Sequence, residues 1–593
     1  MKRTNAVFFA LIFAISALFA FMPAGAGAET KRAKALTAET ETVSGLQTPP
    51  IAIADVKTAD ALSSLKGDDK PVQAILTVGE GGGVIGEKGE KLCDLSVAFN
   101  EYLGESILPV FRVSPSFADA FIAAMASGER AADASVMSSS SETVKKVKEA
   151  FPLMRGIVEF DENADMEKVV PVANESLAQI CVLPEAVASY DNVRYVQARF
   201  KTVWVKAGSD ERMSIKNCVA SGCYGVIAES ASAVNGVLRE YEGGISRTPF
   251  NSAHRGLPEK YNENSVSGTL AAVEAGATHV ELDCYLTKDK EIVFMHDANL
   301  ARTSTGTGNI EDYTSAELNK FHLKQISDEK IPYIEDIAGA LEKSDAVLIL
   351  EIKTNNPDFA DVLKEKLSGD LAWLKNRMVV ISFDGDQLGR MSEVLPGIPV
   401  GDLNGKTSQT IEEILGVACR ENRAIDYNFA ALDKTKNKRL IARGIIPWTW
   451  TYNGEVTVVN GLETGIPAMT NNNADALSLM PEKIAVLPET DKVPEIGGSI
   501  KIEVTEYGGG TKIAEGKVTD VAPAGDGTYE VIAEYDPAED YYISAVMYTQ
   551  KQTVTVKSKK RGCGASAGSG FAPLAFASAV FAIRAEKKRK RKQ

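Results

Sequence analysis

Nine short apolar segments between residues 246 and 480 constrain the fold of this chain more than any other feature. Amphipathic stretches separate most of them, a pattern typical of parallel strands that alternate with helices. The expected strands are Phe250–His254, His279–Cys284, Ile292–His296, Ala346–Lys353, Met378–Phe383, Pro399–Leu403, Ile425–Leu432, Ile445–Thr451 and Pro467–Asn471.

One connection decides how these strands close. The link from Cys284 to Ile292 is shorter than the dozen or so residues that a parallel crossover needs. We therefore predict a hairpin at that link and eight parallel strands elsewhere. A (β/α)₈ TIM barrel typically has about 250 residues, so the α/β segment 246–480 is predicted to be such a barrel.

Residues 51–245 alternate in a similar way and predict a second, non-catalytic βα domain. The expected strands are Ala74–Val78, Leu108–Val113, Gly156–Phe160, Gln179–Leu183 and Thr202–Val205, with helices at Ser116–Ala126 and Ser141–Ala150. The glycines Gly81-x-Gly83-x-x-Gly86 follow a strand and match a dinucleotide fingerprint. The next strand ends at Val113 without the acidic residue that would hold a ribose. We therefore interpret these glycines as a flexible turn.

Residues 481–560 are rich in alternating and β-branched residues and predict a small all-β sandwich. Its expected strands are Ser499–Thr505, Lys512–Val518, Thr528–Glu534, Tyr542–Tyr548 and Thr553–Val556. Nothing there suggests catalysis, so a spacer or a sugar- or wall-binding module is expected. Residues 29–50 are interpreted as a linker.

Both ends of the chain suggest export. Residues 1–28 combine two basic residues, an apolar run and a small-residue cleavage site, as in a signal peptide. Residues 561–593 contain an apolar run, Phe571–Ile583, followed by a basic cluster. This order is similar to bacterial C-terminal sorting signals, and a membrane anchor is the alternative. We expect a cell envelope or cell surface location, with contacts to membrane or sorting machinery through this tail.

The charge and cysteine content exclude two classes of protein. Seven cysteines in 593 residues do not make a disulfide scaffold, although pairing of Cys218 with Cys223 is left open. The net charge of −15 argues against nucleic-acid binding. Without its basic ends, the body of the chain carries −23.

Reactive residues gather where the strands of the expected barrel end. All four histidines, His254, His279, His296 and His322, lie within 69 residues. Glu281 and Asp283 lie two apart on one strand and therefore share a face, as do Glu351 and Lys353 on another. Three converging carboxylates form a set of hard oxygen ligands suited to Ca²⁺ or Mg²⁺. Two histidines beside them could act as general acid and base, and two cations could hold a phosphate.

The order and spacing of these residues resemble the glycerophosphodiester phosphodiesterase family. The matching motifs are His254-Arg255-Gly256, Glu263-Asn264-Ser265, Glu281-Leu282-Asp283, Thr287-Lys288-Asp289, His296-Asp297, Arg302-Thr303, Gly306-Thr307-Gly308, Glu351-Ile352-Lys353, Ser382-Phe383, Trp448-Thr449 and Thr470. The resemblance implies that Glu281, Asp283 and Glu351 bind the metal. It also implies that His254 and His296 form the acid–base pair, and that Arg255 and Lys353 contact phosphate.

Three positions depart from the family pattern. Ser265 replaces a threonine, Lys290 replaces a hairpin glycine, and Asn471 stands where an aspartate usually follows Thr470. None of them removes a residue of the implied catalytic set. His279, His322 and Cys284 are expected to be structural. Two alternatives stay open for Trp448 and Trp450: one of them lines the substrate pocket, or both are packing residues.

The first βα region resembles a degenerate copy of the same barrel. The segment Ser221–Ile227 is similar to the family's closing strand, and Val78-Gly79-Glu80-Gly81 stands in place of His-Arg-Gly. Without histidine this region cannot run a two-histidine mechanism, so we expect it to pack on the catalytic barrel or restrict its mouth. An independent fold is the alternative.

These observations predict an exported, metal-dependent enzyme that hydrolyses glycerophosphodiesters to an alcohol and glycerol 3-phosphate. A related phosphodiesterase acting on lipids, cyclic phosphates or glycerol-phosphate polymers is the second possibility. A surface binding protein with an inactive barrel is the third.

Overall fold

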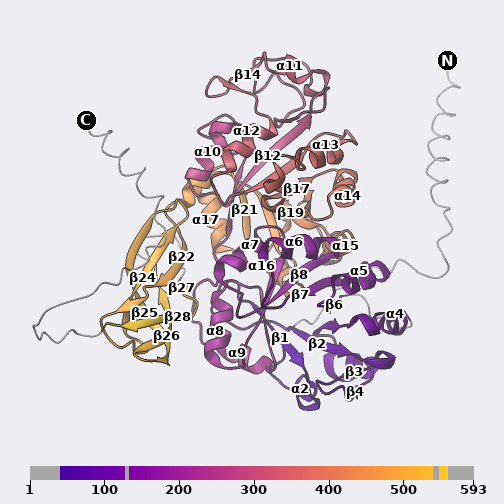
Figure 1. Ribbon diagram of the computed structural model, residues 1–593, viewed down its shortest axis with the longest axis vertical. Coiled ribbons are helices and arrows are strands. Elements are labelled where there is room, and N and C mark those ends of the chain that lie inside the picture. The colour runs from indigo at the N-terminus through magenta and orange to yellow at the C-terminus, as the bar shows by residue number, and fades with distance from the viewer. Residues whose placement is uncertain (1–39, 127–132, 538–545, 558–593) are drawn as a thin grey trace, which may run out of the picture.

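The computed structural model describes residues 40–126, 133–537 and 546–557. They form two βα barrels, stacked along the long axis, and an all-β module at their side (Figure 1). The predicted signal peptide, the 561–593 tail and the first half of the predicted linker (29–39) lie outside the described residues. Within the described residues, no helix has the length and apolarity needed to cross a membrane.

The second barrel is closed, as predicted. Its eight parallel strands are β11 (Phe250–His254), β12 (His279–Leu286), β16 (Val347–Ile352), β17 (Met378–Ser382), β18 (Val400–Asn404), β19 (Ala424–Asn428), β20 (Pro447–Tyr452) and β21 (Ala468–Asn471). The ring closes because β11 pairs with both β12 and β21. β13 (Ile292–Phe294) runs antiparallel to β12, which confirms the predicted hairpin. We call this ring the catalytic barrel.

Helices cover the outside of the catalytic barrel. They are α10 (Val266–Glu274), α12 (Ile334–Leu341), α13 (Phe359–Lys366), α14 (Gly385–Val394), α15 (Ile411–Arg420), α16 (Lys434–Ala442) and α17 (Glu455–Glu463). Several begin at a side chain that accepts a free backbone N–H, such as Ser265 before α10, Asp384 before α14 and Thr410 before α15. Such caps fix where each helix leaves its strand, and so fix the loops at the mouth.

The N-terminal region is a second closed barrel, which overturns the alternative of an unrelated fold class. Its parallel strands are β1 (Ile51–Val56), β2 (Gln73–Val78), β5 (Leu108–Arg112), β6 (Ser135–Ser138), β7 (Arg155–Glu159), β8 (Ala178–Pro184), β9 (Thr202–Lys206) and β10 (Gly225–Ala228). β10 lies in the segment predicted to close the barrel, and it pairs with β1. Val78-Gly79-Glu80-Gly81 follows the second strand, not the first, so its assignment as the counterpart of His-Arg-Gly was wrong.

The first two fingerprint glycines, Gly81 and Gly83, lie in the turn between the antiparallel strands β2 and β3 (Val84–Ile85), and Gly86 directly follows β3. Gly81 and Gly82 have φ values of 70° and 76°, which favour glycine, and they connect β2 to β3. A dinucleotide fingerprint requires a helix directly after the turn. The expected turn is therefore present, and a short antiparallel strand follows it instead of a helix.

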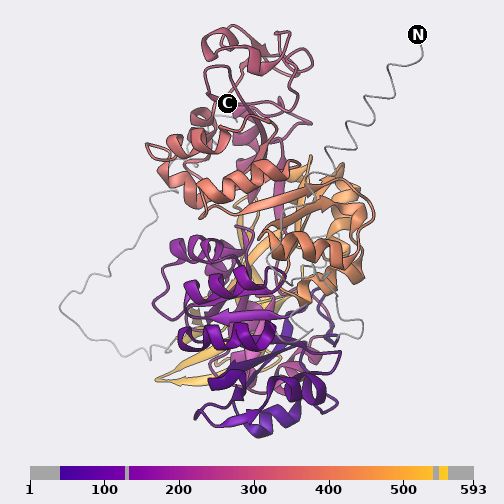
Figure 2. The same cartoon turned by 90° about the vertical axis from the view of Figure 1, so that its right-hand side faces the viewer.

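The two barrels meet through the amino-terminal ends of their strands. The hydroxyl of Thr202, at the start of β9, donates to the carbonyl of Gly444 just before β20, at 2.6 Å. His279, at the start of β12, is fully buried and lies 2.8 Å from the carbonyl oxygen of Ala198. The two mouths therefore open toward opposite ends of the molecule (Figure 2). The N-terminal barrel packs on the catalytic barrel, and the alternative that it restricts the catalytic mouth was wrong.

A buried charge cluster ties the barrels together. Asp133, just before β6, lies 2.7 Å from Nη1 of Arg155 in its own barrel and 2.6 Å from Nη2 of Arg443 in the other. All three side chains are almost completely buried. A buried charge without a partner is costly, so this cluster fixes how the barrels dock.

The β module is built from antiparallel hairpins around its own apolar core. Its strands are β22 (Pro481–Val486), β23 (Glu489–Thr490), β24 (Ser499–Glu506), β25 (Thr511–Gly525), β26 (Thr528–Tyr535), β27 (Met547–Tyr548) and β28 (Gln552–Val556). The first half of β25 pairs with β24 and the second half with β26, so this long strand links the β22–β24 side to the β26–β28 side of the module. The predicted all-β sandwich is confirmed.

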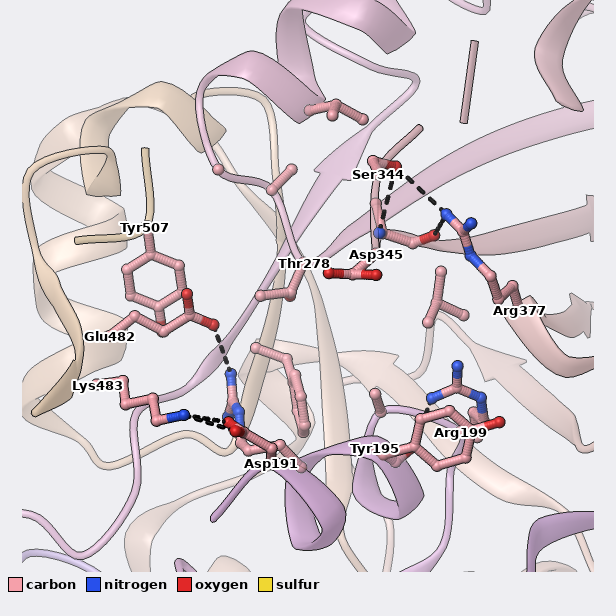
Figure 3. A pocket seen from close by; sticks show the side chains of 18 of the residues that line it. Asp191, Tyr195, Arg199, Thr278, Ser344, Asp345, Arg377, Glu482, Lys483 and Tyr507 are labelled. Atoms are coloured by element: carbon pink, nitrogen blue, oxygen red, sulfur yellow. Dashed lines mark hydrogen bonds and ion pairs between the residues drawn. The ribbon is translucent and has the colours of Figure 1, made fainter. Parts of the chain in front are cut away.

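A cleft of about 910 Å³ opens where the two barrels and the β module meet (Figure 3). Charged side chains in it join the three parts: Lys483 of the module lies 2.6 Å from Asp191 of the N-terminal barrel. Arg199 donates to the carbonyl of Asn376 in the catalytic barrel at 2.5 Å. The cleft lies at the amino-terminal ends of the catalytic strands, on the opposite side from the predicted reactive residues.

The six cysteines in the described residues are all free thiols. Cys218 and Cys223, whose pairing was left open, are both buried, and the thiol of Cys223 donates to the carbonyl of Cys218 at 3.2 Å. Burial raises the pKa of the Cys223 thiol to about 11, so it stays protonated at neutral pH.

Candidate active site

The predicted reactive residues meet at the carboxyl-terminal mouth of the catalytic barrel. The strand register pairs His254 with Glu281 and Asp283 with Glu351. Side chains paired in this way on neighbouring parallel strands point to the same side of the sheet, here into the barrel. The mouth of a TIM barrel is also where residues from different strands can reach a common ligand.

Three carboxylates form the centre of this site. Ligand oxygens of Glu281, Asp283 and Glu351 all lie within 4.8 Å of one another, and the residues are between 1% and 7% exposed. Burial, together with the neighbouring carboxylates, raises the pKa of Glu281 and of Glu351 well above their ordinary range. Burial also disfavours the ionised form of Asp283, but Lys353 and Arg255 hold the pKa of that carboxyl below its ordinary value.

Two cations flank the carboxylates. The Nζ atom of Lys353 lies 2.5 Å from Oε1 of Glu351 and 3.2 Å from Oδ1 of Asp283. Nε of Arg255 lies 3.4 Å from Oδ2 of Asp283, and the Arg255 backbone N–H donates to Glu281 at 3.1 Å. These carboxylates raise the pKa of Lys353 despite its partial burial, so the ammonium stays charged. The site therefore offers acidic oxygens and fixed cations side by side.

His254 is oriented by a pair of amides. Its Nδ1 lies 2.6 Å from Oδ1 of Asn472, and Nδ2 of Asn472 donates to Oδ1 of Asn453 at 2.6 Å. Because the Asn472 oxygen faces the ring, Nδ1 carries the proton and Nε2 is left as a proton acceptor. Nε2 lies 3.9 Å from Oε2 of Glu281. Burial, aided by the Arg255 charge, lowers the pKa of His254 to about 4.

His296 has a carboxylate partner instead. It follows β13, and its Nδ1 lies 2.6 Å from Oδ1 of Asp297. Arg302 also pairs with Asp297, and it reaches Glu263 at 2.6 Å. The hydrogen bond from Arg302 lowers the pKa of Asp297 to about 2, so this carboxylate stays ionised beside the histidine. The two histidines therefore have chemically different partners.

The sequence reasoning missed two asparagines. Asn264 donates from Nδ2 to Asp283 at 2.9 Å and accepts the Asp283 backbone N–H at 2.9 Å, with φ at 55°. It belongs to a motif that carried the resemblance, but no role was given to it. Asn472 had no such signal, because only the fold brings its loop to His254.

Each of the three departures from the family pattern is accommodated by the residues next to it. Lys290 has a φ of 69°, a conformation that favours glycine, so the hairpin turn is strained there as expected. Ser265 caps α10. Asn471 is fully buried and donates to Oδ1 of Asn251 at 3.0 Å, away from the carboxylates.

The remaining candidates separate as follows. His322 lies in a two-residue strand and contacts Asp328 at 2.9 Å. Cys284 donates to the Glu351 carbonyl at 3.3 Å and is buried. Trp448 is fully buried, whereas Trp450 is half-buried and packs edge-to-face on the exposed ring of Phe383, with centroids 5.7 Å apart. Trp450 is therefore the tryptophan that lies nearer the opening.

Comparison with known proteins agrees with this geometry. The family model for glycerophosphoryl diester phosphodiesterases matches residues 254–476, beginning at His254. YhdW of Bacillus subtilis (strain 168) is 28% identical over 238 residues, covering 38% of this chain and 94% of that protein. The glycerophosphodiester phosphodiesterase of the same organism is 25% identical over 250 residues, covering 38% and 83%.

Among solved structures, the glycerophosphodiester phosphodiesterase of Thermotoga maritima is 24% identical, with a TM-score of 0.32, and covers 39% of this chain and 96% of that chain. The matched residues 254–476 lie within the second barrel, which is therefore similar to glycerophosphoryl diester phosphodiesterases, and the family and its relatives support that activity for this part of the chain.

Proposed function

We propose that the protein is an exported, metal-dependent phosphodiesterase that hydrolyses glycerophosphodiesters to an alcohol and glycerol 3-phosphate. The observation that carries this proposal is the buried triad Glu281, Asp283 and Glu351 with two histidines and two cations around it. Three carboxylates buried together are unfavourable for folding, because each disfavours the ionised form of the others. A purely structural role therefore does not explain them.

The triad fits a divalent cation. Oε1 of Glu281 is buried and makes no hydrogen bond to any described residue, although a carboxylate oxygen in that setting needs a partner. The donors are all oxygens, which favour Ca²⁺ or Mg²⁺ over softer metals. Such a cation, when bound, would stabilise negative charge on the phosphoryl oxygens.

The chain's own residues account for the remaining requirements. Arg255 and Lys353 bind the phosphate oxygens and orient the diester in the mouth. One histidine takes a proton from the nucleophile, which is water or the neighbouring glycerol hydroxyl. As the phosphorus–oxygen bond to the alcohol breaks, the other histidine gives a proton to the leaving oxygen. Asn472 and Asp297 hold the two rings in place for these transfers.

Two alternative functions are kept. A related phosphodiesterase acting on lipids or glycerol-phosphate polymers would use the same groups on a larger substrate. A non-catalytic surface binding protein would have no need for the full set of His254, Glu281, Asp283, His296 and Glu351. The completeness of that set favours an enzyme.

Export and attachment to the cell envelope are part of the proposal. They rest on the composition of residues 1–28 and 561–593, which combine apolar runs with basic clusters in the order expected of a signal peptide and of a sorting or anchor segment. Fractionation of cells that produce the full chain, with and without residues 561–593, tests this part directly. Recovery of both forms in the cytosol would contradict it.

Glycerol 3-phosphate release from glycerophosphocholine tests the activity. We expect release by the wild-type protein, loss of release with a chelator and restoration by excess Ca²⁺ or Mg²⁺, and almost none from His254→Ala. Equal rates in all of these samples would contradict the catalytic proposal. Activity of the wild type on another phosphodiester alone would move the assignment to the second candidate.

A further inference from the structure

The cleft between the two barrels and the β module has no part in the proposed reaction. It encloses about 910 Å³, which is within the usual range of small-molecule sites. All three parts of the molecule line it: Arg199 follows α7 (Tyr190–Gln197), Arg377 directly precedes β17, and Lys483 lies in β22 (Figure 3). Because the cleft lies at the amino-terminal ends of the catalytic strands, a ligand bound there would not compete with a diester at the mouth.

Four cations line this cleft, and within the described residues only two of them have acidic partners. Nη2 of Arg194 lies 3.7 Å from a carboxylate oxygen of the β module, and Nζ of Lys483 lies 2.6 Å from Oδ2 of Asp191. Arg199 and Arg377 form no ion pair with a carboxylate of any described residue. These two guanidiniums therefore carry positive charges that the protein itself does not neutralise.

The docking of the barrels brings the two guanidiniums together. Nε of Arg199 donates at 2.5 Å to the carbonyl of Asn376, the residue directly before Arg377. Arg199 is only 6% exposed, and its Cζ lies 3.6 Å from the ring centre of Tyr195, whereas Cζ of Arg377 lies 4.8 Å from the ring centre of Trp373. Burial lowers the pKa of Arg199 to about 10 and also lowers the pKa of Arg377. Each positive charge is therefore disfavoured where it lies.

Each guanidinium keeps a donor group that the protein does not fully use. Nη1 of Arg199 donates to the Tyr195 carbonyl at 2.6 Å, but its Nη2 makes no hydrogen bond to a described residue. In Figure 3 this nitrogen points away from Tyr195, toward the side of the cleft that holds Arg377. Nη2 of Arg377 donates to the Leu341 carbonyl at 2.9 Å, whereas its Nη1 has only a long contact, 3.4 Å, with the Glu342 carbonyl.

A structural role explains each arginine alone but not the pair. Both donate to carbonyls near the ends of helices, Arg199 in α7 and Arg377 in α12, as capping side chains do. Capping does not require two cations to share one cleft, where like charges repel. The remaining carboxylates of the lining, those of Glu167, Glu342 and Asp345, are exposed. Asp345 partly offsets both charges, but water screens it. An anion in the cleft would offset them directly.

We propose that the cleft binds a dianionic phosphate group, free or as the monoester of a small alcohol, between Arg199 and Arg377. Two fixed positive charges match such a group, since a phosphate monoester carries about 1.5 to 2 negative charges at pH 7. A guanidinium that lies over an aromatic ring keeps its N–H groups directed outward in its own plane, where they can donate to phosphate oxygens. We call this place the junction site.

The junction site does not depend on the proposed function, because its residues take no part in that reaction. Its ligand would join one arginine of each barrel, so binding should stabilise their docked arrangement and raise the thermal midpoint of the chain. A general attraction of anions cannot account for such binding, because the body of the chain carries −23. Inorganic phosphate and glycerol 3-phosphate both offer the required group, and titration of each separates these two sources.

The mouth also holds cations that are expected to contact phosphate, so the test uses a full chain in which they are removed. The variant Arg255→Met/Lys353→Met provides this mouth-disabled chain. In that chain, the additional change Arg199→Met/Arg377→Met gives the cleft variant. All proteins are titrated with inorganic phosphate and with glycerol 3-phosphate by calorimetry in metal-free buffer, and their unfolding is followed with and without each ligand.

The matched control removes two guanidiniums elsewhere on the same barrel. Arg390 in α14 and Arg420 in α15 are exposed, and Arg390→Met/Arg420→Met in the mouth-disabled chain makes the same change in net charge. The control should bind within about twofold of the mouth-disabled chain. The cleft variant should bind at least about tenfold more weakly, since two charge-assisted contacts are lost. Tighter binding of either ligand identifies the source, and equal binding shows that the phosphate group alone is recognised.

A second measurement needs no variant, so it decides the matter even if the cleft variant does not fold. Crystals of the wild-type chain are soaked in tungstate, a heavy tetrahedral dianion, and its anomalous signal should lie between Arg199 and Arg377. A signal confined to the mouth would overturn the proposal. A signal in the cleft without binding of either ligand in solution would indicate an adventitious ion only, and would overturn it as well.

Two results of the titrations would also overturn the junction site. They are equal affinities of a folded cleft variant and the control, and the absence of binding by the mouth-disabled chain. Failure of the proposed function gives a different result. A wild-type chain that is inactive on glycerophosphocholine, while the mouth-disabled chain binds phosphate in the cleft, would overturn the proposed function alone and leave the junction site in place.

Discussion

The two barrels have the same strand order but opposite chemistry at their mouths. In each, an antiparallel strand extends from the second barrel strand, β3 on β2 and β13 on β12. Asp55 pairs with Ile75 as His254 pairs with Glu281, so Asp55 occupies the histidine position. Likewise Thr77 and Arg112 pair as Asp283 and Glu351 do. The N-terminal barrel thus has Ile75, Thr77 and Arg112 where the other has its three carboxylates.

An ion pair closes the mouth of the N-terminal barrel. Arg112 donates to both carboxylate oxygens of Asp55, at 2.7 and 3.2 Å, and Asp55 is 2% exposed. Glu159 lies 3.4 Å from Arg112. Complementary charges pair here, whereas the three carboxylates of the catalytic barrel crowd one another around only two cations, Lys353 and Arg255. The comparison shows that the apolar layers of the strands are enough to form this barrel. The charged residues at the mouth decide whether the barrel is a scaffold or a site that requires a ligand.

The largest expected difference between the two barrels is the effect on kcat of replacing the residue at the histidine position. We expect His254→Ala to lower kcat by about a hundredfold or more, since general acid–base catalysis typically contributes about 10²–10⁴-fold. The positional counterpart Asp55→Asn should keep kcat within about twofold of wild type. Glycerol 3-phosphate release measures both. A comparable loss in Asp55→Asn would show that the N-terminal barrel takes part in the reaction.

The charge cluster between the barrels should have the largest effect on stability. In Asp133→Ala, the guanidiniums of Arg155 and Arg443 remain buried without their carboxylate. Breaking a buried pair in this way typically costs about 3–5 kcal/mol, and we expect a clear fall in the thermal midpoint of the full chain. The matched change Asp191→Ala removes an exposed ion pair at the same junction and should have little effect. Equal midpoints for the two variants would contradict a docking role for the cluster.

Metal affinity should fall as the pH is lowered, because the ligand carboxylates then bind protons. Burial and mutual repulsion raise the pKa of Glu281 and of Glu351, the latter to about 8, so protons compete with a cation for these carboxylates. A cation must displace these protons, and its affinity should therefore fall by about tenfold or more between about pH 8 and about pH 6. Calorimetry in buffers of different ionisation enthalpy measures affinity and proton release together. Glu159→Gln, at the other mouth, should not change the dependence, and binding without proton release would contradict the prediction.

Replacement of the ion pair in the N-terminal barrel should have the smallest effect. The single change Arg112→Met leaves Asp55 buried without its partner and should destabilise the chain. The double change Asp55→Leu/Arg112→Met should lie within about 1 kcal/mol of wild type, because apolar residues often replace a buried pair without loss. Chemical unfolding of the three proteins measures the difference. A double variant less stable than the single one would mean that the pair is essential to the barrel.

The sequence predicted the catalytic barrel well because each of its strands lies in an apolar segment and several of these segments contain or precede a motif residue such as His254, Asp283 or Glu351. All nine expected segments contain a strand, from β11 to β21. In the N-terminal barrel, the sequence did not predict β1 or β6 as strands. β6, Ser135-Val136-Met137-Ser138, is short and half of its residues are polar. Their existence depends on ring closure, which is a long-range property.

The candidate site was predicted to the level of its charged residues. Glu281, Asp283, Glu351 and the two histidines converge as expected. The amides of Asn264 and Asn472 were not assigned, because an asparagine in a loop is most often a turn residue and its contacts depend on the fold. The docking of the barrels was likewise unpredictable, since Asp133 and Arg443 are 310 residues apart.

The docking of the barrels has a consequence for the order of assembly during synthesis. β1 pairs with β10, so the first barrel can close once residue 228 has left the ribosome, and Asp133 can then meet Arg155 before Arg443 exists. The closed end of that barrel presents an unfinished charge cluster and apolar side chains to the chain that follows. We expect the first barrel to act as a folding platform on which the later strands assemble, so that a lesion in the inactive barrel lowers the yield of active enzyme without touching its chemistry.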